Sequence, residues 1–399
     1  MTLFKLAIKS LLDRRASVVL AVISMAVSVS VLLGVEHVRY QAKTSFASTV
    51  SGVDLIVGAR TSSMNLLLYS VFRIGAPTNN IQWQSFQTLA NHPDVRWAVP
   101  LSLGDSHKGF RVLGTSQGYF EHYQFGAKKS LNFSQGVIFN DVFDVVLGAN
   151  VARALGYSLG DTLVLSHGIG GTSFTVHDTM PFTVVGILAP TGTPVDETLH
   201  VSLQGIEAVH APHNKITPDR LVPKQITAAM LGLRSKMSTF RVQREINLYA
   251  DEPLTAVLPG VALSELWQVM SVLENSLWVV SILVFVSACL GVGAMLVASI
   301  RARQREIHLL RMIGASPATL FWLVELEALI ITVAGVVIGL VVTSLGLVLL
   351  QDELALRFGL QMSPWVFNAH TGLWLSAMVG VSMIAATIPS LVGYLRSKQ

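Results

Sequence analysis

Four long apolar segments constrain this chain more than any other feature. They cover residues 16–35, 277–300, 320–350 and roughly 372–392. A transmembrane helix needs about 20 consecutive apolar residues to cross the hydrocarbon core of a bilayer, and each segment is about that long or longer. A backbone inside a bilayer must satisfy its own hydrogen bonds, so these segments are predicted to be helices. The sequence therefore predicts a membrane protein with four transmembrane helices.

Composition supports this assignment and narrows the function. Of the 399 residues, 51% are hydrophobic and only 13% are charged, which is too few charges for an ordinary soluble protein. The formal net charge is +4, and the clustered Lys and Arg lie beside apolar segments, so we expect no nucleic-acid partner. The single cysteine, Cys289, lies inside an apolar segment, which excludes an internal disulfide and a cysteine-based zinc site.

The N-terminus carries four basic residues before the first apolar segment, as a signal peptide does: Lys5, Lys9, Arg14 and Arg15. That segment is longer than the roughly 7–15 residues of a cleavable signal, and no small-residue cleavage site follows it, so we predict an uncleaved anchor. Apolar residues at positions 3, 4, 7, 8 and 11 recur at helical spacing. This pattern predicts an amphipathic helix in the membrane interface. The alternative is that these residues extend the first transmembrane helix.

The Lys and Arg residues beside the apolar segments predict the orientation. The N-terminal segment, the loop at residues 301–317 and the C-terminal tail hold most of them. The loop between the third and fourth segments has only Arg357, set against Asp352 and Glu353. We therefore expect a multi-pass protein of the bacterial inner (plasma) membrane, with both termini in the cytoplasm and the large segment after the first helix in the periplasm.

The large segment between the first two transmembrane helices is predicted to be a mixed α/β domain, because apolar residues alternate between turn signals. The expected strands cover residues 53–57, 96–99, 110–113, 182–188 and 199–201, and the expected helices cover 84–90 and 150–155. The fold class is thus an α-helical membrane protein with four transmembrane helices and a large mixed α/β periplasmic domain inserted between helices 1 and 2. The predicted parts are an interfacial helix (1–15), helix 1 (16–35), the periplasmic domain (36–274), helix 2 (275–300), a cytoplasmic loop (301–317), helix 3 (318–350), a periplasmic loop (351–371), helix 4 (372–393) and a cytoplasmic tail (394–399).

The sequence gives no sign of an enzyme. It has no GxxxxGK[ST] phosphate-binding motif, so we do not expect this chain to hydrolyse ATP. Asp161, Ser166 and His167 are close in the sequence, but no GxSxG motif accompanies them, and a catalytic triad is not predicted. We expect no catalytic residue and no cofactor bound by this chain.

Histidines are the one group with metal-binding chemistry. Ten of the eleven fall on the predicted periplasmic side, and neutral imidazole is a good zinc ligand. The candidate ligands are His200, His210 and His213, although Pro212 disfavours a helix that presents the last two on one face. The alternative is that these are ordinary surface or hydrogen-bonding histidines.

Small and acidic residues mark special positions in the apolar segments. Gly335 and Gly339 have the GxxxG spacing at which helices approach closely, and Gly291 with Gly293 lies in the middle of the second segment. Glu325 and Glu327 lie near the start of the third segment, where a carboxylate is costly. We expect these two residues to pair with Arg311 or neighbouring arginines rather than to relay protons.

The residues from 305 to 339, REIHLLRMIGASPATLFWLVELEALIITVAGVVIG, resemble a region of MacB/FtsX-like ABC transporter permeases. The positions that match its pattern are Arg305, Glu306, Ile307, Arg311, Gly314, Ala315, Glu327, Ala328, Gly335 and Gly339. His308 departs from the pattern, since the family often has glycine there, and so does the C-terminal tail. The stretches VVLGANVARALGYSLGDTLVL and FTVVGILAPTGTP resemble the periplasmic domain of the same permeases.

This resemblance implies a type VII ABC transporter, in which two permease chains pair with two cytoplasmic ATPase subunits that bind ATP and Mg²⁺. The permease pair is expected to be a homodimer, with a heterodimer as the alternative. The loop at 301–317 corresponds to the coupling helix that docks into the ATPase, with Arg305, Glu306, Ile307, Leu310, Arg311 and Gly314 as the docking residues. Helix movement would then be carried into the periplasmic domain, which is mechanotransmission.

Three functions follow as hypotheses. The first is a permease subunit that moves a substrate from the periplasm or the outer leaflet, in contact with membrane lipids and a periplasmic substrate-carrying protein. The second is an FtsX-like transmitter that regulates a periplasmic hydrolase or sensor. The third is a component of a zinc-handling system that uses the periplasmic histidines. The size of the periplasmic domain favours the first over the second, because transmitters of this kind tend to have smaller domains.

Overall fold

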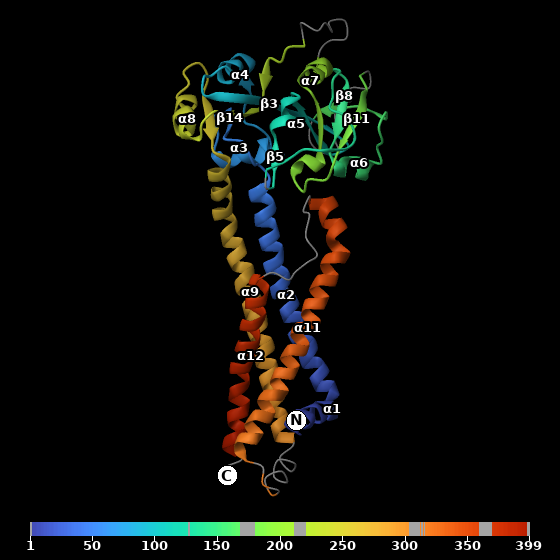
Figure 1. The fold of residues 1–399 in the computed structure, drawn as a ribbon, viewed down its shortest axis with the longest axis vertical. Coiled ribbons are helices and arrows are strands. Elements are labelled where there is room, and N and C mark those ends of the chain that lie inside the picture. Colours follow the sequence, from blue (N-terminus) through green and yellow to red (C-terminus); the bar gives the residue numbers. More distant parts are fainter. Residues whose placement is uncertain are drawn as a thin grey trace. The chain divides into compact units, whose positions relative to one another are not determined.

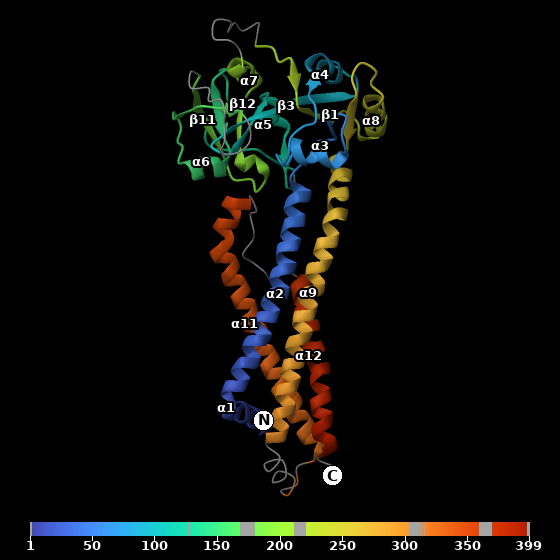
Figure 2. The same ribbon diagram turned by 180° about the vertical axis from the view of Figure 1, so that it is seen from behind.

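The chain divides into two compact units in a computed structural model. One, here called the membrane unit, comprises residues 1–41, 271–351 and 362–399, and the other, the α/β domain, comprises residues 42–270 and 352–361. The structure describes residues 2–126, 128–167, 180–210, 221–302, 312, 314, 316–358 and 369–396. Figures 1 and 2 show their helices and strands from opposite sides.

The membrane unit is built from helices. They are α1 (Thr2–Asp13), α2 (Arg15–Ser48), α9 (Pro259–Ala302), α11 (Pro317–Phe358) and α12 (Ala369–Arg396). Four stretches within them are long and apolar enough to cross a membrane: Arg15–Gln41, Pro259–Ala298, Phe321–Gln351 and Thr371–Ile388. The predicted fold class, with four membrane helices and an α/β domain inserted between the first and second, is confirmed.

Two of these helices run well past their apolar segments. α2 continues to Ser48, and α9 already begins at Pro259, so each is one uninterrupted helix that extends beyond the predicted transmembrane stretch. α1 is a separate short helix, because a turn at Arg14 divides it from α2. In both views α1 points away from the direction of α2 (Figures 1 and 2).

A mixed sheet of eleven strands organises the α/β domain. Its main path runs β15-β1-β14-β3-β4-β12-β8-β11-β7, with β10 beside β3 and β9 beside β11. Only two pairs among its described strands are parallel, β12 with β4 and β8 with β11. The strands are β1 (Leu55–Ala59), β3 (Val95–His107), β4 (Phe110–Thr115), β7 (Phe133–Gly136), β8 (Asp144–Leu147), β9 (Thr162–Leu163), β10 (Ser166–His167), β11 (Phe182–Leu188), β12 (Thr198–Ser202), β14 (Ala228–Leu233) and β15 (Leu254–Val257).

Smaller elements complete the domain. Two short ribbons pair β2 (Ile81–Gln82) with β13 (Gln225–Ile226), and β5 (Gln124–Phe125) with β6 (Lys129–Ser130). The helices are α3 (Ser63–Ser70), α4 (Trp83–Ala90), α5 (Gly118–His122), α6 (Ala149–Leu155), α7 (Leu203–His210) and α8 (Thr239–Asn247), with 3₁₀ turns η1 (Pro194–Glu197) and η4 (Lys236–Ser238).

Alternation along each strand builds a core on both faces of the sheet, because successive side chains of a strand point to opposite faces. In β1, Ile56 joins one buried cluster with α3, whereas Leu55 and Val57 join another with α4 and α8. In β8, Val146 packs on the first face, and its two neighbours face a third cluster with α6 and α7. The same alternation in β12 puts His200 on the first face, against rings of α5.

Candidate functional site

A buried polar cluster lies in the membrane unit where α1, the start of α2 and α11 meet. The guanidinium of Arg14 donates from Nη2 to Oε2 of Glu327 at 3.1 Å and to Oγ of Ser10 at 2.9 Å. The hydroxyl of Ser10 in turn donates to Oε1 of Glu327. Both carboxylate oxygens of Glu327 therefore accept hydrogen bonds from the N-terminal segment.

Local sequence explains how the N-terminal segment reaches this carboxylate. Helical spacing puts Ala7, Ser10 and Leu11 on one buried face of α1. The turn at Arg14, whose N–H donates to the carbonyl of Leu11 at 3.2 Å, directs its side chain back along α1, and its Nε donates to the carbonyl of Ser10 at 3.3 Å. The cluster is thus set by the break between α1 and α2.

Burial makes the pairing important. The side chain of Glu327 is 1% exposed and that of Arg14 is 18% exposed. A lone carboxylate at such a place would cost several kcal/mol of desolvation free energy, which only a charged partner and further hydrogen bonds can offset. The sequence suggested Arg311 as the partner, a residue outside the described part of the chain. From the sequence, Arg14 is only one of the basic residues that predict the orientation of the chain in the membrane.

A second site of contact in the membrane unit is the close approach of α2 to α11. A Cβ added to Gly339 would stand 2.8 Å from the carbonyl oxygen of Ala26, and one added to Gly335 would stand 2.6 Å from Cγ of Met25. The hydroxyl of Ser30 on α2 also donates to the carbonyl of Gly339 at 2.9 Å. Both glycines of the GxxxG pair therefore lie where the backbones of these helices approach each other.

The two glycines of the second apolar segment lie elsewhere. Gly291 is exposed. A Cβ added to it would meet no described atom of another helix within 4 Å. It lines a groove of about 490 Å³ between α2 and α9, together with Ala21 and Met295. Gly293 is half-buried.

The predicted docking residues of the 301–317 loop fall mostly outside the description. Arg305, Glu306, Ile307, Leu310 and Arg311 all lie outside the described residues. Gly314 is described, exposed, and has a φ of +96°, a conformation that disfavours residues with a Cβ. α11 begins three residues later, and Ser316 caps it by accepting from the N–H of Thr319.

The three candidate metal ligands are not brought together among the described residues. His200 is fully buried against the rings of Tyr119 and Phe120. Burial and the nearby charge of Arg73 lower its pKa to about 3, which keeps it neutral. His210 is 3.6 Å from the buried carboxylate of Asp105, whereas His213 lies outside the described residues. Within the described part of the chain, no group of three or more His, Cys, Asp or Glu has the arrangement of a metal site.

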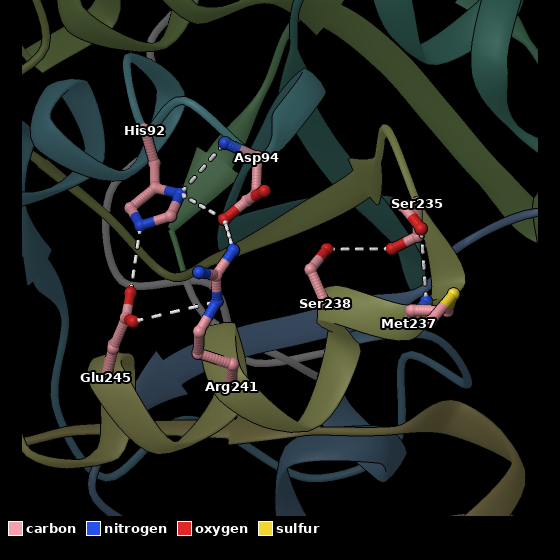
Figure 3. Close-up of polar contacts among 7 residues, drawn as sticks. All are labelled: His92, Asp94, Ser235, Met237, Ser238, Arg241 and Glu245. Atoms are coloured by element: carbon pink, nitrogen blue, oxygen red, sulfur yellow. Dashed lines mark hydrogen bonds and ion pairs between the residues drawn. The ribbon is translucent and has the colours of Figure 1, made fainter.

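An exposed charged cluster joins α8 to the turn before β3 (Figure 3). Nε2 of His92 lies 3.0 Å from a carboxylate oxygen of Glu245, and the Nδ1 atom accepts from the N–H of Asp94 at 3.2 Å. Arg241 donates to the carboxylate of Asp94 and lies 4.0 Å from that of Glu245. Since the guanidinium occupies the place between the two carboxylates, the cluster is an ion-pair network on the domain surface (Figure 3).

Comparison with known proteins identifies the family. Residues 17–248 match the model of the MacB-like periplasmic core domain, and residues 278–395 match that of the FtsX-like permease C-terminal region. The comparison with curated proteins gave no match.

Two solved structures are among those similar to the chain. One is the periplasmic region of MacB from Actinobacillus actinomycetemcomitans, at 14% identity and a TM-score of 0.37, covering 55% of this chain and 94% of that one. The other is the extracellular domain of the noncanonic ABC-type transporter YknZ from Gram-positive bacteria, at 11% identity and a TM-score of 0.32, covering 51% of this chain and 99% of that one.

The first family model covers more than half of the chain, and the second covers its three later membrane helices. One model describes a periplasmic core domain and the other the C-terminal region of a permease. The chain therefore belongs to the family of MacB- and FtsX-like, or type VII, ABC transporter permeases.

Proposed function

We propose that this chain is the permease subunit that couples ATP hydrolysis by a separate cytoplasmic ATPase to a conformational change of its α/β domain in the periplasm, and so moves a substrate out of the periplasm or the outer leaflet. The observation that carries the proposal is the buried Arg14–Glu327 pair, because it ties the N-terminal segment to α11, the helix that begins just after the 301–317 loop.

The described contacts support a path for the movement. Glu327 lies ten residues after the start of α11, about 15 Å along the helix. Further along α11, Gly335 and Gly339 contact α2, so a displacement of α11 acts on α2 at two levels. α2 then continues as one helix to Ser48. A push on the loop would thus reach α2 through packed backbone and a buried ion pair, without a substrate path through the membrane.

The proposal includes an assembly. Two copies of the cytoplasmic ATPase would bind ATP and Mg²⁺, and two permease chains would pair, as a homodimer in the simplest case. The exposed apolar side chains of α2, among them Leu20 and Ile23, would face lipid or the second chain. The basic residues beside the spans support cytoplasmic termini, and a periplasmic substrate-carrying protein would deliver the cargo.

The docking of the loop can be tested in the complex of this chain with its ATPase. Glu306→Arg reverses a charge at the docking surface, which opposes binding of the ATPase. The variant chain should still insert into the membrane, but transport-coupled ATP hydrolysis should fall at least about tenfold, whether or not the complex stays assembled. Arg396→Gln, at the end of α12, is the matched control and should leave hydrolysis unchanged. Unchanged hydrolysis with Glu306→Arg would refute the assignment of the loop, and a complex that activates a periplasmic hydrolase but moves no cargo would favour the transmitter.

A further inference from the structure

A cavity of about 410 Å³ opens in the α/β domain beside the loop that follows α3. Its walls are formed by the end of α3, by residues 75–80, by Leu103 and Gly104 of β3, and by Arg111 of β4. Thr78, Asn79 and Asn80 are the uncharged polar residues, apart from Tyr69, among its lining. No sequence motif marks these residues, because they belong to three segments that only the sheet brings together.

Two arginines give this cavity its charge. Arg73 and Arg111 both line it, and none of the described lining residues is acidic. Among the described ion pairs, none involves either arginine. Both guanidinium-bearing residues line the same cavity, and burial together with the positive charge of Arg73 lowers the pKa of Arg111. Two like charges held side by side without a carboxylate favour the binding of an anion.

Each arginine uses part of its hydrogen-bonding capacity on the backbone. Arg73 donates from Nη1 to the carbonyl of Ser70 at the end of α3, and Arg111 donates from Nη2 to the carbonyl of Gly75 at 2.6 Å. A guanidinium has five N–H donors, so these contacts fix the two groups and leave donors available. Neutral carbonyls also leave both charges uncompensated. The Nε atom of Arg73 is buried and has no hydrogen-bond partner among the described residues.

The end of α3 also carries a buried hydroxyl, which lies against Gly58 of β1. Tyr69 lines the cavity, is 1% exposed, and its hydroxyl makes no hydrogen bond with any described group. Burial raises the pKa of Tyr69 to about 12, so the hydroxyl stays protonated and can donate.

Arg73 has an unfavourable backbone conformation for a residue with a side chain. Its φ of 60° lies in the left-handed region, where glycine is the favoured residue. An arginine there bears a steric cost that glycine would avoid. The chain nevertheless carries a guanidinium here, in a residue that lines the same cavity as Arg111.

We propose that this cavity binds an oxyanionic group, a phosphate or a carboxylate, carried by a small solute that reaches the α/β domain. The planar fork of each guanidinium matches the oxygen spacing of both groups. The inference is independent of the ATPase coupling proposed above, since it concerns residues of the α/β domain alone.

The test uses the full-length protein in detergent, with inorganic phosphate and succinate as the two probes. Binding is measured by calorimetry and by the shift of the unfolding midpoint, against potassium chloride at equal ionic strength. At least one probe should bind and raise the midpoint, and which of them does so identifies the group. If neither binds at millimolar concentration, or if chloride gives the same shift, the proposal is overturned.

Variants separate the site from general charge effects. Arg73→Gly should fold normally, because glycine suits the positive φ at this position. Arg73→Gly and Arg111→Gln should each weaken binding of the probe about tenfold or more, because each variant loses charge-assisted hydrogen bonds to it. Arg111→Lys keeps the charge without the fork and should retain part of the affinity. Arg96→Gln removes an exposed arginine of β3 outside the cavity and should change nothing. Equal loss of affinity with Arg96→Gln, or full affinity with Arg73→Gly, would contradict the proposal.

Discussion

Arg14 and Glu327 lie 313 positions apart in the sequence and form an ion pair with 3.1 Å between Nη2 and Oε2. The carboxylate is almost fully buried, and the hydroxyl of Ser10 occupies its other oxygen. The pair joins the first helices of the chain to the helix that follows the 301–317 loop. The pair therefore holds α11 and the N-terminal segment together.

Removing one partner of this pair should destabilise the membrane unit strongly. Arg14→Gln is expected to cost roughly 3 kcal/mol, because it leaves the charge of Glu327 buried without its arginine. Arg14→Gln combined with Glu327→Gln should recover much of that loss, since the buried charge is then gone. Thermal unfolding of the purified chain in detergent measures both. Arg15→Gln removes the adjacent exposed arginine, and an equal loss with that variant would contradict the account.

The glycines of α11 should differ in their tolerance of a methyl group. Gly339→Ala meets the backbone carbonyl of Ala26 at 2.8 Å and should cost about 1–3 kcal/mol, because a backbone cannot rotate away. Gly335→Ala meets Cγ and Cβ of the buried Met25 at 2.6 and 2.7 Å, and should cost about as much, because a Cβ cannot move without its backbone. Gly346→Ala faces open space and should be neutral or stabilising by a few tenths to about 1 kcal/mol. Unfolding midpoints in detergent give the order, and a Gly346 variant as damaging as the Gly339 variant would refute it.

The buried neutral His200 predicts a pH dependence of stability. Its folded-state pKa of about 3 lies below the ordinary value of 6.5, so the unfolded chain takes up a proton between these values that the folded chain does not. Stability from this group is present above pH 6.5 and falls as the pH decreases toward 3, by about 1.4 kcal/mol per pH unit at most.

His200→Phe, which suits the neighbouring rings of Tyr119 and Phe120, should remove this component. Urea unfolding between pH 4 and pH 7 should then give a flatter curve for the variant than for the unchanged chain. His122→Gln alters a half-exposed histidine and should keep the original slope. Identical slopes for His200→Phe and the unchanged chain would show that the histidine is not held neutral.

The charged network of Figure 3 should contribute little by comparison. The side chain of Arg241 is 63% exposed, and exposed ion pairs are worth at most about 1 kcal/mol. Arg241→Gln should therefore cost less than about 1 kcal/mol, and less still in 0.5 M salt. A loss in unfolding free energy as large as that of Arg14→Gln would contradict the assignment of this cluster to a solvated surface.

The lengths and periods of apolar segments, which depend only on residues near in sequence, predicted several helices and strands of this fold. The length of the apolar segments predicted the membrane helices, and the period of apolar residues at positions 3–11 predicted a separate helix, α1. The helix predicted at 150–155 and the strand predicted at 182–188 agree with α6 and β11 within one residue. By contrast, the strand predicted at 96–99 is much shorter than β3. The structure instead carries β3 through Pro100 to His107, with neighbouring strands on both sides.

Long-range pairings were beyond the reach of the sequence. Nothing near position 327 indicates a partner at position 14, and the cavity beside α3 needs β3 and β4 to bring Arg111 to Arg73. Tyr69 likewise resembles an ordinary core aromatic until its hydroxyl is found without a partner. Each of these depends on which strands and helices become neighbours, and single-sequence periodicity carries no such information.

Composition of the complex tests the central claim most directly. The chain is purified with an affinity tag from its native membrane in mild detergent, and the mass of the intact assembly is measured by native mass spectrometry with and without ATP and Mg²⁺. The account predicts two permease chains with two copies of an ATP-binding subunit. A chain that purifies alone, or only with proteins that bind no nucleotide, would contradict it.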